Sequence, residues 1–153
     1  MKKLSILLMF LLCMPLLMAQ NIDKVFNSLK SEPNCIFFHL NSNTIGTMEE
    51  GQNKLLIEKL NIEEAKVLVF DQASQQTVKK YTNLTDKLKG KQDYETLVAV
   101  NDDDNKVLIL GKMEDKIATE VLLFVEDDHD IVFVWAKGKL NPEEINKAIQ
   151  VHK

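Results

Sequence analysis

The stretch EVLLFVEDDHDIVFVW, residues 120–135, decides the fold. It holds two runs of branched and aromatic residues, 120–125 and 131–135, separated by an acidic segment that contains His129. Such runs on either side of a polar turn predict a β-hairpin. Neither run alternates apolar with polar residues, as strands with one wet face do. We therefore expect both faces of the sheet to be covered, by helices on one side and by a loop, a second copy or a partner on the other.

Further apolar runs extend the predicted sheet along the chain. LVAV (97–100) and KVLIL (106–110) precede the hairpin, and a second acidic segment, NDDDN, joins them. These runs and the hairpin predict a four-strand antiparallel meander. Upstream, CIFFHL (35–40) and AKVLVFD (65–71) each predict one more strand.

Amphipathic segments with capping residues predict the helices. Apolar residues at helical spacing follow Asn21 and stop before Pro33. A longer segment begins after Ser74, a suitable N-cap, and ends at Gly90. The last helix covers residues 142–152 and starts with a proline and two glutamates, which suit a first turn.

Residues 41–60 are harder to interpret. Their leucines favour a helix near 52–60, but two glycines weaken any helix across the whole segment, so we assign it no structure. The complete pattern predicts a single α+β domain over residues 21–153. We expect a mixed sheet with an antiparallel C-terminal meander, packed against about four helices.

Residues 1–20, MKKLSILLMFLLCMPLLMAQ, are expected to be a signal peptide that is removed. Two lysines precede an apolar run, and Ala19 offers a small residue for cleavage. The run contains a proline and is shorter than the ~20 residues that a spanning helix needs, which argues against a membrane anchor. A lipid anchor would need small residues before a cysteine, whereas Cys13 follows two leucines. We expect an exported protein with no stable membrane span after processing.

The charge of the chain disfavours nucleic-acid partners. The chain has 19 basic residues, all lysine, and 23 acidic ones; removing Lys2 and Lys3 leaves 17 against 23, a net charge of −6. Nucleic-acid affinity begins with neutralised phosphates, and arginine is the commonest reader of guanine. Glycine-rich phosphate-binding motifs are absent as well. We therefore expect no nucleic-acid partner and assign no cofactor-binding residues and no cofactor.

The two acidic segments have two interpretations. Aspartate and asparagine favour turns because their side chains bond to nearby backbone amides and tolerate left-handed geometry. Alternatively, the first and third turns of a meander share one end of the sheet, so their carboxylates together predict a weak calcium site. The EF-hand pattern is absent. The candidate calcium ligands are Asp102, Asp104, Asp127, Asp128 and Asp130.

No residue pattern selects a catalytic site. The three histidines His39, His129 and His152 form no zinc-binding pair. Cys35 and His39 would lie about 13 Å apart along one strand, too far for a hydrogen bond. The apolar neighbours of Cys35 indicate a small buried apolar residue, with a reactive nucleophile or an intermolecular disulfide as the alternative. We expect Trp135 in the core, with an exposed anchor as the alternative. We assign no catalytic residues and expect no enzymatic activity, with a carboxylate-dependent hydrolase as the alternative.

The mature chain resembles a family called domain of unknown function 4252, exported proteins of Bacteroides-type bacteria. The matching pieces are IDKVFNSL, YETLVAVND, IATEVLLFVEDD and GKLNPEEINKAI. The resemblance implies a periplasmic or surface location in a Gram-negative cell. It implies no activity, and no functional residues are carried over from it.

These observations predict an exported, non-catalytic envelope protein. We expect it to bind another protein or a small ligand through its sheet face, because its strands are apolar and catalytic motifs are missing. An unknown envelope protein or a second copy are the expected partners.

Overall fold

The computed structural model describes residues 22–89 and 93–150. The predicted leader, the helix end at Gly90 and His152 lie outside these residues. The described helices are α2 (Ile22–Lys30), α3 (Ser42–Gly46), α4 (Gln52–Lys59), α5 (Gln75–Lys89) and α6 (Pro142–Gln150). The strands are β1 (Cys35–Leu40), β2 (Ile62–Phe70), β3 (Glu95–Asn101), β4 (Asn105–Glu114), β5 (Ile117–Asp127) and β6 (Asp130–Leu140).

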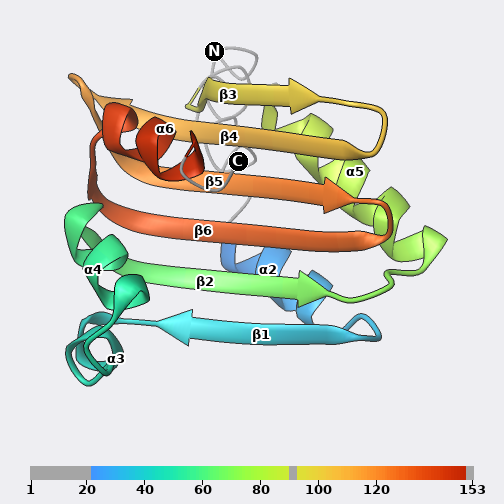
Figure 1. Ribbon diagram of the computed structural model, residues 1–153. Helices are drawn as coiled ribbons and strands as arrows, with labels where there is room; N and C mark the ends of the chain where they lie inside the picture. The colour runs from blue at the N-terminus through green and yellow to red at the C-terminus, as the bar shows by residue number, and fades with distance from the viewer. Residues whose placement is uncertain (1–21, 90–92, 151–153) are drawn as a thin grey trace, which may run out of the picture.

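The six strands form one open sheet in the order β1-β2-β6-β5-β4-β3 (Figure 1). The predicted α+β class and the C-terminal meander are therefore confirmed. Every strand pair is antiparallel, so the sheet is not the mixture of parallel and antiparallel pairs that we expected. The reason is that β2 enters the sheet beside β6, the last strand of the chain, and runs opposite to it.

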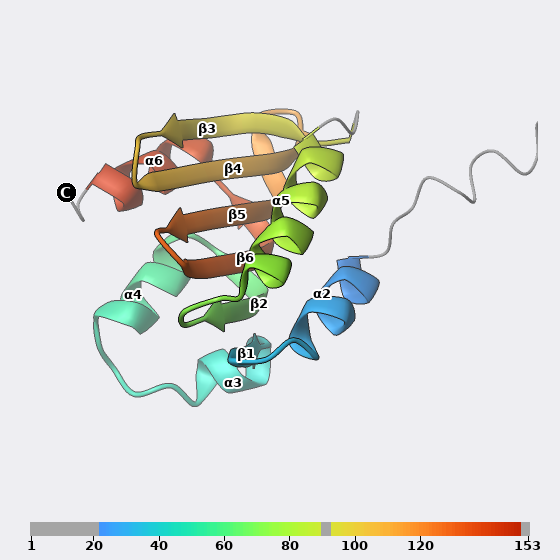
Figure 2. The same cartoon turned by 90° about the vertical axis from the view of Figure 1, so that its right-hand side faces the viewer.

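One face of the sheet is covered along its length by α2 and α5 (Figure 2). We call it the helix face. Phe133 on β6 stacks on Phe26 of α2, with ring centroids 4.6 Å apart, and on Phe124 of β5 at 4.7 Å. Tyr81 of α5 meets Phe124 edge-on. Trp135 is 7% exposed in this core, which confirms its predicted burial.

The opposite face is covered over only part of its area. Figure 1 shows α6, α4 and α3 at one end of it. Ile145 of α6 packs there in a cluster with Ala65 and Ala136. Small residues let a helix approach the sheet closely. Gly111 lies in the same cross-strand row, where the Leu97 side chain fills the place of its missing Cβ. The prediction that both faces are covered therefore holds for the helix face and for one half of the other.

Local signals place the N-terminal ends of α5 and α6 as predicted. The Thr77 backbone N–H donates to Ser74 Oγ (3.1 Å), and the Glu143 N–H donates to Asn141 Oδ1 (2.9 Å). Residues 41–60, to which we assigned no structure, form α3 and α4 with a break between them. Within the described part of the chain, no helix has the length and apolarity to cross a bilayer.

The last strand is longer than predicted. The apolar run predicted for it ends at Trp135, but β6 continues to Leu140. Gly138 pairs with Ile62 where the register between β2 and β6 shifts. A Cβ at position 138 would lie 2.1 Å from the Asn61 carbonyl oxygen, so glycine is needed for backbone approach rather than for a turn.

Candidate functional site

The acidic turns meet at one end of the sheet. The Asp128 N–H, in the β5–β6 turn, donates to the Asp104 carbonyl of the β3–β4 turn (3.2 Å). The loop after β2 joins them: the Gln72 N–H donates to Asp130 Oδ1 (2.9 Å) and the Ala73 N–H to the His129 carbonyl (2.8 Å). We call this edge the acidic end. The predicted geometry, in which the two turns share one end, is confirmed.

Two of the calcium candidates, Asp102 and Asp128, have the local roles of turn residues. Asp102 Oδ1 accepts the Asp103 N–H (2.8 Å), and Asp128 adopts a left-handed φ of 52°. These are the roles expected of aspartate in turns. Among residues 22–89 and 93–150, no group of three or more His, Cys, Asp or Glu side chains converges in a metal-binding arrangement. Weak calcium binding by Asp102, Asp104, Asp127, Asp128 and Asp130 stays a prediction.

The histidines and the cysteine do not converge. His39 Nε2 lies 2.8 Å from Glu64 Oε1 on the neighbouring strand, and His129 lies 3.8 Å from Asp128 within the turn. Burial raises the pKa of the Cys35 thiol, with Lys30 nearby opposing that shift. A raised pKa leaves less thiolate at neutral pH and so makes Cys35 a poorer nucleophile.

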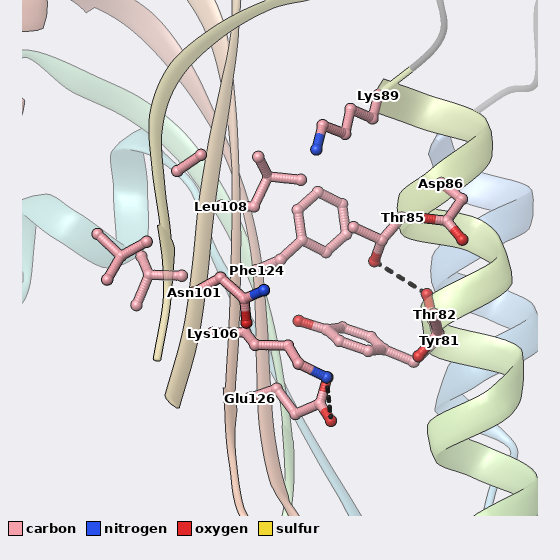
Figure 3. Close-up of a pocket in the computed structure, with 13 residues that line it drawn as sticks. Tyr81, Thr82, Thr85, Asp86, Lys89, Asn101, Lys106, Leu108, Phe124 and Glu126 are labelled. Carbon is pink, nitrogen blue, oxygen red and sulfur yellow. Dashed lines mark hydrogen bonds and ion pairs between the residues drawn. The ribbon is translucent and has the colours of Figure 1, made fainter. Parts of the chain in front are cut away.

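A hollow of about 340 Å³ lies between α5 and the β3–β4 side of the helix face (Figure 3). Phe124 and Leu108 supply apolar walls from the sheet. Small or polar residues on β3, Ala99 and Asn101, leave this space under α5. No sequence motif indicated the hollow, because its walls come from segments that are distant along the chain.

Two carboxylates line the hollow without pairing with each other. Figure 3 shows Asp86 beside Thr85 on α5 and Glu126 turned toward Lys106 on the sheet. Lys106 Nζ lies 3.5 Å from Glu126 Oε1. The Tyr81 hydroxyl donates to the Val125 carbonyl (3.3 Å), and burial, followed by the negative charge of Glu126, raises the pKa of Tyr81. Glu126 thus forms an ion pair with a lysine, and the two carboxylates of the hollow do not act as a pair.

A second polar cluster on the helix face centres on Glu120. The Trp135 Nε1–H and the Tyr94 hydroxyl both donate to Glu120 Oε2, each at 3.2 Å. Burial, and then the charge of Glu120, raises the pKa of Tyr94. Lys66 Nζ lies 5.3 Å from the centre of the Trp135 ring and pairs with Asp23. These bonds fix the indole and leave it buried, which is a structural role.

The half of the other face that α3, α4 and α6 leave open, within residues 22–89 and 93–150, consists of two cross-strand rows. Directly opposite residues in antiparallel strands share a face, so the strand register defines each row. The row nearest the acidic end takes one residue from every strand: Ile36, Val69, Val132, Val125, Val107 and Val100. The next row is equally apolar: Phe38, Val67, Val134, Leu123, Ile109 and Val98. We call these two rows the open half.

The open half exposes apolar side chains to solvent. Ile36 and Phe38 are each 52% exposed and Val100 is 45% exposed, while Ile109 is buried beside the α6 cluster. The remaining members of both rows are half-buried. Asp127 and Asp130 face each other two residues beyond Val125 and Val132, so this apolar surface borders the acidic end directly.

A family model described as domain of unknown function (DUF4252) matches residues 36–148, which is more than half of the chain. No curated protein and no solved structure matches the chain.

Proposed function

This chain belongs to the DUF4252 family, as its sequence resemblance predicted, and we propose that it is an exported, non-catalytic module that docks a protein partner on the open half of its sheet. The observation that carries the proposal is the pair of apolar rows, which span all six strands. Among the described residues, the α6 cluster buries Ile109 of these rows, while Ile36, Phe38 and Val100 stay exposed. Contiguous exposed apolar surface rimmed by polar residues marks interaction sites. The apolar, proline-containing leader of the sequence supports export.

The charges around the open half suggest the chemistry of the partner. Its two rows contain no charged residue, and the neighbouring acidic end carries three aspartates in the first turn and three more around the second. His129 is the one basic side chain between β5 and β6. Complementary potentials at an interface pair a negative rim with a positive one. The partner therefore presents an apolar patch with lysine or arginine along the side that meets the acidic end.

The size of the open half is suited to the core of such an interface. Six strands have five spacings of about 4.8 Å, so each row is about 24 Å long. Two rows cover on the order of 300 Å². A stable interface buries about 800 Å² on each partner, so the rows can form its core while surrounding residues supply the remainder. The acidic end supplies the polar rim that surrounds the apolar core of ordinary interfaces.

Site-specific photo-cross-linking in the cells that produce the protein tests the proposal. A benzophenone amino acid replaces Val134 in the open half or, as a control, Leu55, which is 60% exposed on α4. We expect irradiation to give one discrete adduct from position 134 and none from position 55. Adding Val132→Lys to the first variant should abolish the adduct while leaving the circular dichroism spectrum unchanged.

Three outcomes would contradict partner docking. They are no adduct from position 134, equal adducts from both positions, and an adduct with twice the mass of the chain, which would identify a second copy on this surface. Fractionation of the same cells tests export: the protein should lie in the envelope and begin near Asn21. Retention of residues 1–20 in the cytoplasm would refute it.

A carboxylate-dependent hydrolase is the second candidate, favoured only by the presence of Asp86 and Glu126 in one hollow. It is weakened by the ion pair of Glu126 with Lys106 (3.5 Å), which a substrate would have to displace before it could reach this carboxylate. If the hydrolase were correct, the purified mature chain would hydrolyse glycoside or ester substrates and Glu126→Gln would abolish this activity.

Weak calcium binding at the acidic end is compatible with docking and is tested separately. If the acidic end binds calcium, calorimetric titration of chelator-treated protein with calcium will show saturable heat that is lost in an Asp104→Asn, Asp127→Asn variant. No heat at calcium concentrations of about 1 mM would exclude the site, since extracellular modules bind calcium at about 0.1–1 mM.

A further inference from the structure

Strand β1 forms an outer edge of the sheet and pairs only with β2 among the described strands (Figure 1). An edge strand presents unpaired N–H and C=O groups, which can template pairing with another chain. Natural proteins block such edges with charged side chains, prolines, bulges or covering segments. The two edge strands of this sheet, β1 and β3, differ in these protective features.

The opposite edge, β3, is protected and β1 is not. β3 begins with Glu95, has a register shift between Thr96 and Val98, and runs into the acidic β3–β4 turn. β1 pairs with β2 in uninterrupted register over all of its six residues. Its two most exposed side chains, Ile36 and Phe38, are large, apolar and each 52% exposed.

The β1 edge also lies within an uncharged segment. No Asp, Glu, Lys or Arg occurs in residues 33–48, although 27% of the whole chain is charged. Two mature chains that each carry −6 repel each other, and the repulsion is weakest where their surfaces are neutral. Two charged side chains border this strand, Lys30 at 4.6 Å from the centre of the Phe37 ring and Glu64 at 2.8 Å from His39, and their charges are opposite. A second copy therefore brings an equally apolar strand whose bordering charges cancel.

We propose that β1 pairs with β1 of a second copy, in antiparallel register about a two-fold axis at Phe37, so that the two sheets join into one of twelve strands. Opposite residues share a face in antiparallel pairing, and a two-fold axis at Phe37 places Ile36 opposite the partner's Phe38 and Phe38 opposite the partner's Ile36. Each exposed side chain then has an apolar lateral neighbour from the other copy. The apolar rows of the two open halves become continuous, although docking on either open half does not depend on this pairing.

Light scattering and sedimentation of the mature chain test the pairing. We expect a dimer, which Phe38→Lys converts to a monomer by weakening the dissociation constant at least about 100-fold, because it introduces a like charge from each copy at the joint. Val100→Lys is the matched control, since Val100 is 45% exposed on the same face but lies on the other edge strand. It should leave the dimer intact.

A monomeric mature chain at about 100 µM, a dimeric Phe38→Lys variant, or equal dissociation of the two variants would overturn the proposal. Because photo-cross-linking at Val134 reports docking on the open half, this result is independent of the proposed function.

Disulfide trapping tests the register. A two-fold axis at Phe37 places Cys35 opposite the partner's His39, and opposite residues have Cα atoms about 4.5–5.5 Å apart, within the range of a disulfide. His39→Cys should therefore give a covalent dimer under mild oxidation. The unmodified chain and Leu40→Cys should not, because Cys35 has no cysteine opposite it in either case. Equal trapping in all three, or none with His39→Cys, would overturn this register.

Discussion

Gly138 illustrates how one residue controls the meeting of β2 and β6. The Asn61 carbonyl oxygen occupies the place of a side chain at position 138, and the Lys139 N–H donates to that same carbonyl (3.3 Å). Any Cβ would push these two backbone segments apart. The residue is thus required by packing between two distant parts of the chain.

Gly138→Ala should destabilise the protein by about 3 kcal/mol, because the new Cβ meets backbone that cannot move aside as a flexible side chain would. Gly46→Ala is the control, since nothing lies within 4 Å of the Cβ added there. It should change stability little or increase it by up to about 1 kcal/mol. Urea unfolding of both variants measures the difference, and equal stabilities would contradict this role for Gly138.

The two tyrosines of the chain, Tyr81 and Tyr94, both have a pKa that burial raises above the ordinary value of about 10. Above pH 10 the unfolded chain releases phenolic protons that the folded chain keeps. The contribution of the two buried phenols to the free energy of unfolding is therefore complete below about pH 10 and is lost as the pH rises further.

Ultraviolet titration provides a direct readout, because no other residue contributes phenolate absorbance. The folded protein should show almost none at about pH 11, where the urea-unfolded chain is largely ionised. Tyr81→Phe should reduce the alkaline loss of unfolding free energy. Phenolate absorbance at about pH 11 with an unchanged circular dichroism spectrum would show that the rings are accessible.

At the scale of elements, α6 lies over the part of the sheet where the side chains are small. Lys59 of α4 and Lys147 each contact Glu144 of α6, at 3.3 and 3.0 Å, and their hydrogen bonds lower the pKa of Glu144. Beneath the helix, Ala65 and Ala136 are 5% exposed. On the same face of β6, Val134 belongs to the open half. Two successive positions on one face of this strand therefore differ, since Ala136 is packed under a helix of the described chain and Val134 is not.

Ala136→Leu should destabilise the protein by about 1–3 kcal/mol, because the larger side chain displaces α6. Val134→Leu, two residues away on the same face, should change stability by less than about 0.5 kcal/mol, since Val134 belongs to neither buried cluster of the described residues. Urea unfolding compares the two variants. Equal destabilisation would mean that the open half is packed as tightly as the α6 contact.

The sequence predicted local elements better than their pairing. Caps such as Ser74 and Asn141 act within one helical turn, so they could be identified from the chain alone. The strands proved longer than their apolar cores because charged residues such as Lys112 and Lys137 continue the ladders. The pairing of β2 with β6 joins segments far apart in the chain, and no local signal encodes it.

At the scale of the whole molecule, this long-range pairing also creates the candidate site. The sequence predicted the acidic turns and their common end, since both depend on neighbouring strands of a meander. The open half could not be predicted, because valines on one strand do not reveal whether a helix covers them. Only the register of six strands shows that Ile36 and Val100 end the same uncovered row.

Cysteine labelling in living cells tests most directly whether a partner covers the open half. Val134→Cys and, as a control, Leu55→Cys are made in a Cys35→Ser background and treated with a maleimide that crosses the outer membrane. Both positions should react in the purified protein. In cells, position 134 should be protected while position 55 still reacts; equal reactivity of the two positions in cells would contradict a docked partner.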